Sequence, residues 1–193
     1  MLALLSEEGG SHCRGRRPHR TEPRINAAYA QLPPAEPGSF WGGYVRRPAR
    51  LHLGAPGRGY GFVTPAAKFL FVGADNHGNV DAVRMSPQVE ALPFNEAVAV
   101  VDDLQSQLQR GGWRRIHIAD KPSTMGGPDV TKKMRECAAP TAYWQAANKF
   151  QLSLDIGCFR SNDHPNDERY LITLNISTSW IADDTPLSRQ KNP

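Results

Sequence analysis

Three pairs of an aspartate and a histidine lie close together in the sequence and are candidates for acid–base catalysis: Asp75 with His77, His117 with Asp120, and Asp163 with His164. A carboxylate beside an imidazole can orient it as a general base, as in many hydrolases. However, the first and third pairs lie in stretches dense in turn-forming residues, and the second follows a short predicted strand. Local structure alone therefore accounts for each pair.

The three cysteines are Cys13, Cys137 and Cys158. Cys158 could serve as a nucleophile beside a distant histidine, but its place in an alternating strand pattern favours a buried structural residue. Cys137 and Cys158 are candidates for a disulfide if the chain reaches an oxidising compartment; in a cytosolic protein they would be two buried thiols. The residues alone leave both alternatives open.

Established catalytic signatures are missing from the sequence. It contains no GxSxG nucleophile elbow, HExxH, paired CxxC or Walker phosphate loop, and the glycine-rich stretch 57–61 fits a tight loop that leads into an edge strand. We therefore predict no catalytic residue, metal site or cofactor. An enzyme with a dispersed site is an alternative that a deep pocket holding His117 or Cys158 beside a carboxylate would favour.

The clearest structural element is a helix predicted within Leu92–Trp113. Pro93 suits its first position, and Gly111 and Gly112 supply a left-handed stop after it. The apolar residues recur at spacings of three and four, so we expect them to form one buried stripe. They are Phe94, Ala97, Val98, Val101, Leu104 and Leu108.

Two hairpins are predicted from alternating apolar residues on either side of turn-forming stretches. The first joins Lys68–Gly73 to Val80–Met85 through Asp75–Asn79. The second joins Phe150–Phe159 to Tyr170–Trp180 through a polar loop of ten residues, which begins at Arg160 and ends at Arg169.

Between the hairpins we predict one strand and two helical pieces in addition to the long helix. Residues 113–118 (WRRIHI) give a short strand whose arginines and His117 face away from the two isoleucines. Asp129 caps a helix that runs to Cys137, and Pro140 ends it. Thr141 then caps a second short helix that runs to Lys149.

The expected fold is an α+β domain with the order β-β-α-β-α-β-β. Its mainly antiparallel sheet has about five strands, and two helical segments cover one face. Residues 1–38 form a poorly ordered, proline-rich basic arm, residues 39–182 a single domain, and residues 183–193 a polar tail. At the domain boundary the aromatic group Phe40, Trp41 and Tyr44 could anchor the end of the arm on the domain or mark a contact surface, and we expect core anchoring.

Charge is concentrated at the N-terminal end. Residues 1–60 hold nine arginines, no lysine and four glutamates, so they carry +5 and the remainder −1 of the overall net charge of +4. An arginine-rich terminus without interleaved aromatics argues against nucleic-acid binding and for a solvated or juxtamembrane flank. Residues 1–5 are apolar but too short to span a bilayer, so a membrane tether upstream of Met1 is our hypothesis.

A protein partner is the binding target that best fits an antiparallel sheet with one open face and polar loops. We expect contacts through the loop around Asp75–Asn79, the exposed arginines of the short strand and the loop around Arg160–Arg169. The candidate partner-binding residues are Asp75, His77, Asn79, Arg114, Arg115, Asp163, His164 and Asp167.

Two stretches, LHLGAPGRGYGFVTP followed by FLFVG, and VRMSPQVEALPFNEAVAVVDDLQSQLQRGGWRRI, resemble uncharacterised envelope-associated proteins of Gram-negative bacteria. Some of these proteins are encoded beside genes for secretion-system toxins. The resemblance covers residues 48–116 and carries no catalytic motif. It implies a periplasmic domain, or one tethered to the inner membrane and facing the periplasm, and an immunity protein that binds a secreted toxin.

The sequence thus predicts a binding protein of the bacterial envelope, in its most specific form a toxin-neutralising protein that needs no cofactor. A structural component of an envelope or secretion assembly is the alternative from another class. A stable oligomer or a large exposed apolar patch would favour that alternative.

Overall fold

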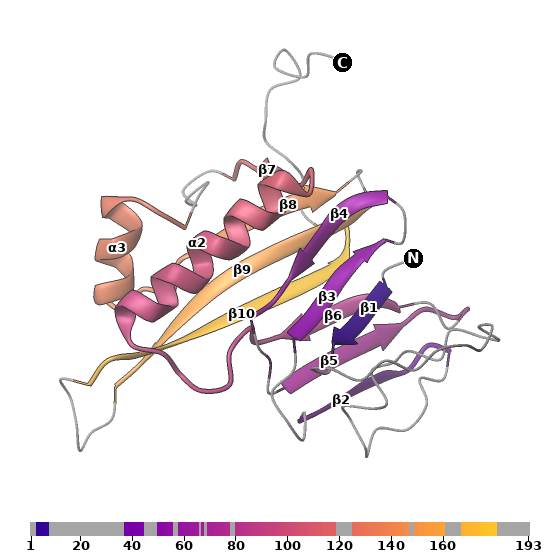
Figure 1. Cartoon of the computed structure of the whole chain (residues 1–193), viewed down its shortest axis with the longest axis horizontal. Coiled ribbons are helices and arrows are strands. Elements are labelled where there is room, and N and C mark those ends of the chain that lie inside the picture. Colours follow the sequence, from indigo (N-terminus) through magenta and orange to yellow (C-terminus); the bar gives the residue numbers. More distant parts are fainter. Residues whose placement is uncertain are drawn as a thin grey trace, which may run out of the picture.

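The computed structural model describes residues 3–7, 37–44, 50–55, 58–65, 67, 69–77, 80–118, 125–146, 149–160 and 167–180. In these residues the larger sheet has the spatial order β2 (Phe40–Tyr44), β5 (Phe69–Ala74), β6 (Val80–Met85), β10 (Arg169–Thr178), β9 (Phe150–Phe159), β8 (Thr141–Ala146) and β7 (Arg114–Ile116). The smaller sheet contains β1 (Ala3–Glu7), β3 (Arg50–Ala55) and β4 (Arg58–Val63). The helices are α2 (Phe94–Arg110) and α3 (Pro128–Arg135) (Figure 1).

The predicted α+β class is confirmed, because all strand pairs within the described residues are antiparallel. Both helices also cover the same face of the seven-stranded sheet (Figure 1). The Phe94 ring of α2 packs edge-on against the Tyr170 ring, with ring centroids 5.6 Å apart. The Tyr170 hydroxyl lies 3.5 Å from the Met134 carbonyl of α3. The sheet is larger than the five strands expected.

Helix α2 forms where the sequence predicts it. Pro93 is the N-cap and not the first helical residue, and the left-handed residue after the helix is Gly112 (φ 86°), since Gly111 keeps a right-handed conformation. The buried stripe includes one polar residue, Gln105, whose side-chain oxygen accepts a hydrogen bond from the Met125 N–H at 2.8 Å. The amide thus satisfies a buried backbone group.

Side-chain hydrogen bonds from α2 and from the segment after it connect the helix to the small sheet at the β4 edge. Gln107 donates to the Val63 carbonyl at 2.9 Å and accepts from the Val63 N–H at 2.8 Å, so it closes the free edge of β4. Trp113 Nε1 donates to the Tyr60 carbonyl at 2.8 Å. These bonds cover edge groups of β4 that would otherwise need water.

The central strand β10 is hydrogen-bonded beyond its pairing with β6. Past Met85, the Ser86 hydroxyl donates to the Ile172 carbonyl at 2.8 Å. Gln88 then donates to the Tyr170 carbonyl and accepts from the Ile172 N–H, at 2.8 and 2.9 Å. Side chains thereby replace a missing strand, and the buried backbone of β10 keeps its partners.

The helix predicted at Thr141–Lys149 is wrong, because residues 141–146 form β8 between β7 and β9. Ala142, Trp144 and Ala146 alternate into the core, which is the period of a strand. Aromatic residues on both faces of this strand produced the misleading helical spacing. The other short helix, predicted from Asp129 to Cys137, is α3, and it buries Val130 and Met134. Its N-cap is Gly127, so Asp129 lies in the first turn and does not cap the helix.

Three further expectations need correction. Register places Arg115 opposite Trp144 and Ile116 opposite Tyr143, so the two arginines of β7 lie on opposite faces and Arg114 shares its face with Ile116. Phe40 is 64% exposed and does not anchor the core. Residues 57–61 were expected to form a tight loop that leads into an edge strand, but residues 58–61 belong to strand β4, which pairs with β3 in a second sheet.

The predicted arm, domain and tail are only partly within the described structure. Residues 3–7 of the arm form β1, which pairs with β3, whereas residues 8–36 and the tail at 183–193 lie outside the described residues. The proposed division at residue 38 stays a prediction.

Candidate functional site

The two faces of the seven-stranded sheet differ, and the register shows which residues share the outer face, away from α2 and α3. One row crosses all seven strands on this face. It consists of Gly42, Phe71, Arg84, Asn175, Ser153, Tyr143 and Ile116. Several side chains on this face are exposed and available to a ligand, among them Phe71 and Arg84.

Three phenylalanines form an aromatic strip on the outer face of β2 and β5: Phe40, Phe69 and Phe71. The Phe40 and Phe71 rings stack with centroids 5.9 Å apart and planes at 7°, and Phe69 meets Phe71 edge-on at 5.9 Å. Phe40 and Phe71 are 64% and 37% exposed. Glycine at position 42 is required, since a Cβ there would overlap the Phe71 ring.

Arg84 extends the aromatic strip toward the middle of the sheet. It lies beside Phe71 in the register, it is exposed, and it forms no ion pair with another described residue. Aromatic residues and arginine are the side chains most enriched at protein interfaces and at the positions that dominate binding energy. Together the aromatic strip and Arg84 have the composition of a protein-contact surface.

The centre of the outer face is a closed polar network around Asp155. Its carboxylate accepts hydrogen bonds from Thr141 (2.7 Å), Ser153 (2.9 Å) and Asn175 (3.0 Å), and Asn175 also donates to the Ser153 hydroxyl at 3.0 Å. Burial and, secondarily, the Asp155 charge raise the pKa of Tyr143 above its usual value. The acceptor oxygens of Asp155 are occupied, so this network joins β8, β9 and β10 and offers little to a ligand.

At the β5–β6 turn, Asp75 is engaged in local structure. Its side chain accepts a hydrogen bond from the His77 N–H at 2.8 Å, and its carbonyl accepts one from the Gly38 N–H at 2.9 Å. His77 is exposed. The predicted partner-binding residue Asn79 lies outside the described residues.

The other predicted contact residues do not join this turn. Asp163 and His164 are outside the described part of the chain, and Asp167 forms an exposed ion pair with Arg169 at 2.9 Å. Because Leu174 pairs with Met85 and Ile176 with Val83, the β5–β6 turn lies near the end of β10, whereas the β9–β10 loop precedes its start. The two loops therefore lie at opposite ends of the sheet, roughly 30 Å apart at the usual rise per residue.

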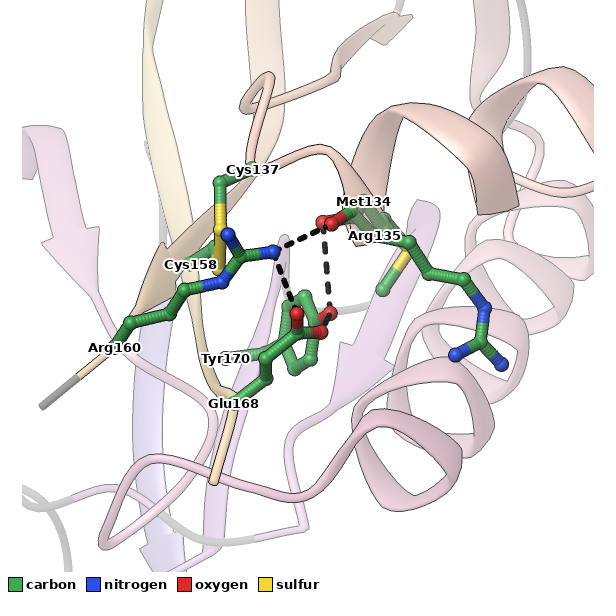
Figure 2. Close-up of a disulfide and its surroundings, with 7 residues drawn as sticks. All are labelled: Met134, Arg135, Cys137, Cys158, Arg160, Glu168 and Tyr170. Atoms are coloured by element: carbon green, nitrogen blue, oxygen red, sulfur yellow. Dashed lines mark hydrogen bonds and ion pairs between the residues drawn. A yellow bond between two sulfur atoms is a disulfide. The ribbon is translucent and has the colours of Figure 1, made fainter. Parts of the chain in front are cut away.

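On the helix side, a disulfide joins Cys137, just after α3, to Cys158 of β9, with Cα atoms 5.1 Å apart (Figure 2). Beside it, Arg160 donates to the Arg135 carbonyl at 2.9 Å and pairs with Glu168 at 2.5 Å. These contacts occupy a C-terminal carbonyl of α3, which has no partner within the helix.

Tyr170 of β10 also belongs to this cluster. Its hydroxyl donates to Glu168 at 2.8 Å, a bond that, with Arg160, lowers the pKa of Glu168. Burial first, and then the hydrogen bond and charge of Glu168, raise the pKa of Tyr170 to about 12. The cluster holds α3 on the sheet, and the aromatic ring remains in the core.

The features that would indicate catalysis are not assembled in the described residues. His117 is exposed, Asp120 lies outside them, and the Cys158 sulfur is bonded to Cys137. Within that part of the chain, histidine, cysteine, aspartate and glutamate form no group of three that could hold a metal ion. No helix there is long and apolar enough to cross a membrane.

The sequence marks Phe40 as part of a possible contact surface, but Phe69 and Phe71 belong to an apolar run that equally suits a core strand, so the aromatic strip as a whole was not predicted. The alternation of Phe40 and Tyr44 around the glycines is the one signal that could have revealed it. No protein-family model matches this chain, and neither a curated protein nor a solved structure shows significant similarity to it. The site must therefore be interpreted from its own geometry.

Proposed function

We propose that this chain is a protein-binding domain of the bacterial envelope that neutralises a secreted toxin by stoichiometric binding. The observation that carries the proposal is the aromatic strip with Arg84 on the open face of the sheet. Two exposed, stacked phenylalanines cost free energy in water, and a partner that covers them recovers it. The toxin-specific form of the proposal depends on the resemblance of residues 48–116 to proteins encoded beside toxin genes.

The disulfide between Cys137 and Cys158 supports the proposed compartment. Disulfides persist in oxidising compartments such as the periplasm and are rare in the reducing cytosol. The structure joins two segments that the chain separates by 21 positions. This supports a periplasmic location, or one tethered to the inner membrane and facing the periplasm.

Neutralisation by binding needs no chemistry from this chain. An apolar side chain of the toxin would pack on Phe40 and Phe71, and a neighbouring carboxylate would pair with Arg84. The toxin would lose activity because the bound domain blocks access to its active site. The proposal therefore predicts saturation at one chain per toxin molecule, with no added cofactor.

The test begins with affinity capture of the tagged chain from its native host, a salt wash and mass spectrometry. The captured protein is then purified, and its enzymatic activity is titrated with the chain. We expect one secreted enzyme to survive the wash and to lose activity at a 1:1 ratio. Recovery of the chain alone, or of envelope machinery without an inhibited enzyme, contradicts the proposal.

Matched variants locate the contact. Phe40→Asp places a charge in the aromatic strip and should weaken inhibition at least tenfold, on the order of 1.4 kcal/mol or more. Phe159→Asp changes another exposed phenylalanine, which is 53% exposed. It lies at the C-terminal end of β9, and strands β6 and β10 separate β9 from β5. This control should inhibit like the unmodified chain, and equal losses in both variants would exclude the aromatic strip.

A structural role in an envelope or secretion assembly is the second candidate, and the same exposed phenylalanines favour it. The strand β2 lies at the edge of the sheet, and its sequence FWGGY contains no charged residue. Edges of this kind pair with other strands unless they are covered. Sedimentation velocity distinguishes the candidates, since an assembly component forms concentration-dependent oligomers and a neutralising domain stays monomeric.

A further inference from the structure

An arginine occupies a core position in the row of side chains that faces α2. The register aligns one residue from each of six neighbouring strands on this face. They are Arg115, Trp144, Leu152, Ile176, Val83 and Val72. Five members are apolar or aromatic and at most 2% exposed, and the sixth, on the edge strand β7, is a cation.

Two hydrogen-bond donors at this end of the row have no acceptor. The Nε of Arg115 and the Nε1 of Trp144 are both shielded from solvent, and neither has a hydrogen-bond partner within the described part of the chain. The guanidinium carbon lies 4.9 Å from the centroid of the Trp144 ring. Burial lowers the pKa of Arg115 from its usual value. Buried donors in native proteins nearly always have a partner, so two neighbouring exceptions need an explanation.

The cation–π contact explains only part of this arrangement. Stacking on the indole face favours the positive charge of Arg115. It satisfies neither N–H, however, because both donors require an acceptor atom in line with the N–H bond. The missing component must therefore supply acceptors, and next to an arginine it would best be negatively charged.

We infer that Arg115 and Trp144 form a binding site for a small oxyanion, a phosphate or a carboxylate, at the β7 edge of the sheet. Arg115 holds the anion by charge and through a forked pair of N–H groups, and Trp144 contributes its indole N–H. Entry is feasible because β7 has three residues and pairs on one side only, and because Arg115 itself is half-buried. This inference does not depend on the proposed function.

The test uses the indole N–H signals of the full-length protein in a two-dimensional ¹⁵N–¹H NMR spectrum. The chain has four tryptophans, and Trp144→Phe identifies the signal of Trp144 by its loss. Inorganic phosphate and acetate are titrated separately to millimolar concentrations, with chloride as the ionic-strength control. We expect the Trp144 signal to move downfield and saturate with at least one of the two anions.

Trp113 is the internal control, because its Nε1 already donates to the Tyr60 carbonyl at 2.8 Å. Its signal should stay fixed while that of Trp144 moves. Arg115→Gln should weaken the apparent affinity at least tenfold, and Arg84→Gln, a change to an exposed arginine on the outer face, should not alter it. Arg115→Lys retains the charge without the forked donors and should bind with intermediate affinity.

The relative responses to the two anions show whether the site favours phosphate or carboxylate. A Trp144 signal that moves with neither anion overturns the inference. A shift shared by all four indoles, or one that persists in Arg115→Gln, also overturns it. If Arg115→Gln does not fold, the saturable response of Trp144 in the unmodified protein, together with Arg115→Lys, still decides the question.

Discussion

The two faces of the seven-stranded sheet are made from alternate residues of the same strands, yet they follow different rules. The helix face is apolar from β5 to β8, and its side chains are buried under α2, α3 and β4. The outer face carries a polar network in its middle and aromatic rings at one end. On each face a few residues depart from this pattern of burial and polarity. Folding alone does not require these residues.

The exception on the helix face is Arg115, and those on the outer face are Phe40 and Phe71. An arginine in a core row and phenylalanines on an open face each reduce stability in the isolated chain. Residues that serve folding alone would conform to the face on which they lie. The two ligands that we propose differ accordingly, a protein surface on the outer face and an oxyanion on the helix face.

The largest expected effect separates the two faces directly. Leu174→Ala, at a fully buried position on the helix face, should lower the free energy of unfolding by about 2–5 kcal/mol. Thr173→Ala, its neighbour on the outer face, should cost less than about 1 kcal/mol. Urea denaturation measures both. Equal costs would mean that the outer face is as tightly packed as the helix face.

The second effect tests whether the helix layer depends on its covalent link. Removing the disulfide with Cys137→Ala/Cys158→Ala should cost about 3 kcal/mol, because the bond closes a loop with a sequence separation of 21. Amide exchange should accelerate in α3 and remain slow in β10. A reducing agent should destabilise the unmodified chain and leave the double variant unchanged, unless the two sulfur atoms are not bonded in solution.

A smaller effect is expected on the outer face. Asp155→Asn keeps the size of the side chain but weakens its three accepted hydrogen bonds, and should cost about 1 kcal/mol. Loss of the charge should also lower the pKa of Tyr143, measurable by ultraviolet titration against Tyr143→Phe. An unchanged tyrosine titration would show that burial alone perturbs Tyr143.

The smallest effect is a pH dependence on the helix side. The pKa of Tyr170 rises from 10.0 to about 12 on folding, so its contribution to stability is fully present below pH 10 and is lost as the pH rises toward 12. The stability difference between the unmodified chain and Tyr170→Phe should therefore shrink across this window. Unfolding experiments in urea at several pH values measure it, and a constant difference contradicts the assignment.

The long, regular elements could be predicted from the sequence. The boundaries of β6 and β9 match, and α2 begins one residue later than Pro93 suggests, because local signals such as caps and alternation determine them. Strand β8 was missed since Tyr143 and Trp144 are apolar on opposite faces, which obscures a period of two. Residues 141–146 form a strand because their backbone pairs with β7 on one side and with β9 on the other.

The candidate sites were hardest to predict because they depend on register between distant strands. Arg115 was expected on an exposed face with Arg114, but pairing with β8 turns it toward the core. Similarly, nothing local in FWGGY or FLFVGA shows that Phe40 stacks on Phe71 across two strands. A one-residue change in register would exchange the faces, and the three residues of β7 are too few for the hydrophobic pattern to fix its register.

The position of β10 in the sheet has a consequence for biosynthesis. It is the last described strand in the chain, yet it lies between β6 and β9 and joins the two halves of the larger sheet. Strands β2, β5 and β6 cannot be united with β7, β8 and β9 until residues 169–178 have paired with both halves. Until then the inner edges of both halves are open to other chains, so protection by a chaperone should matter most before β10 has paired.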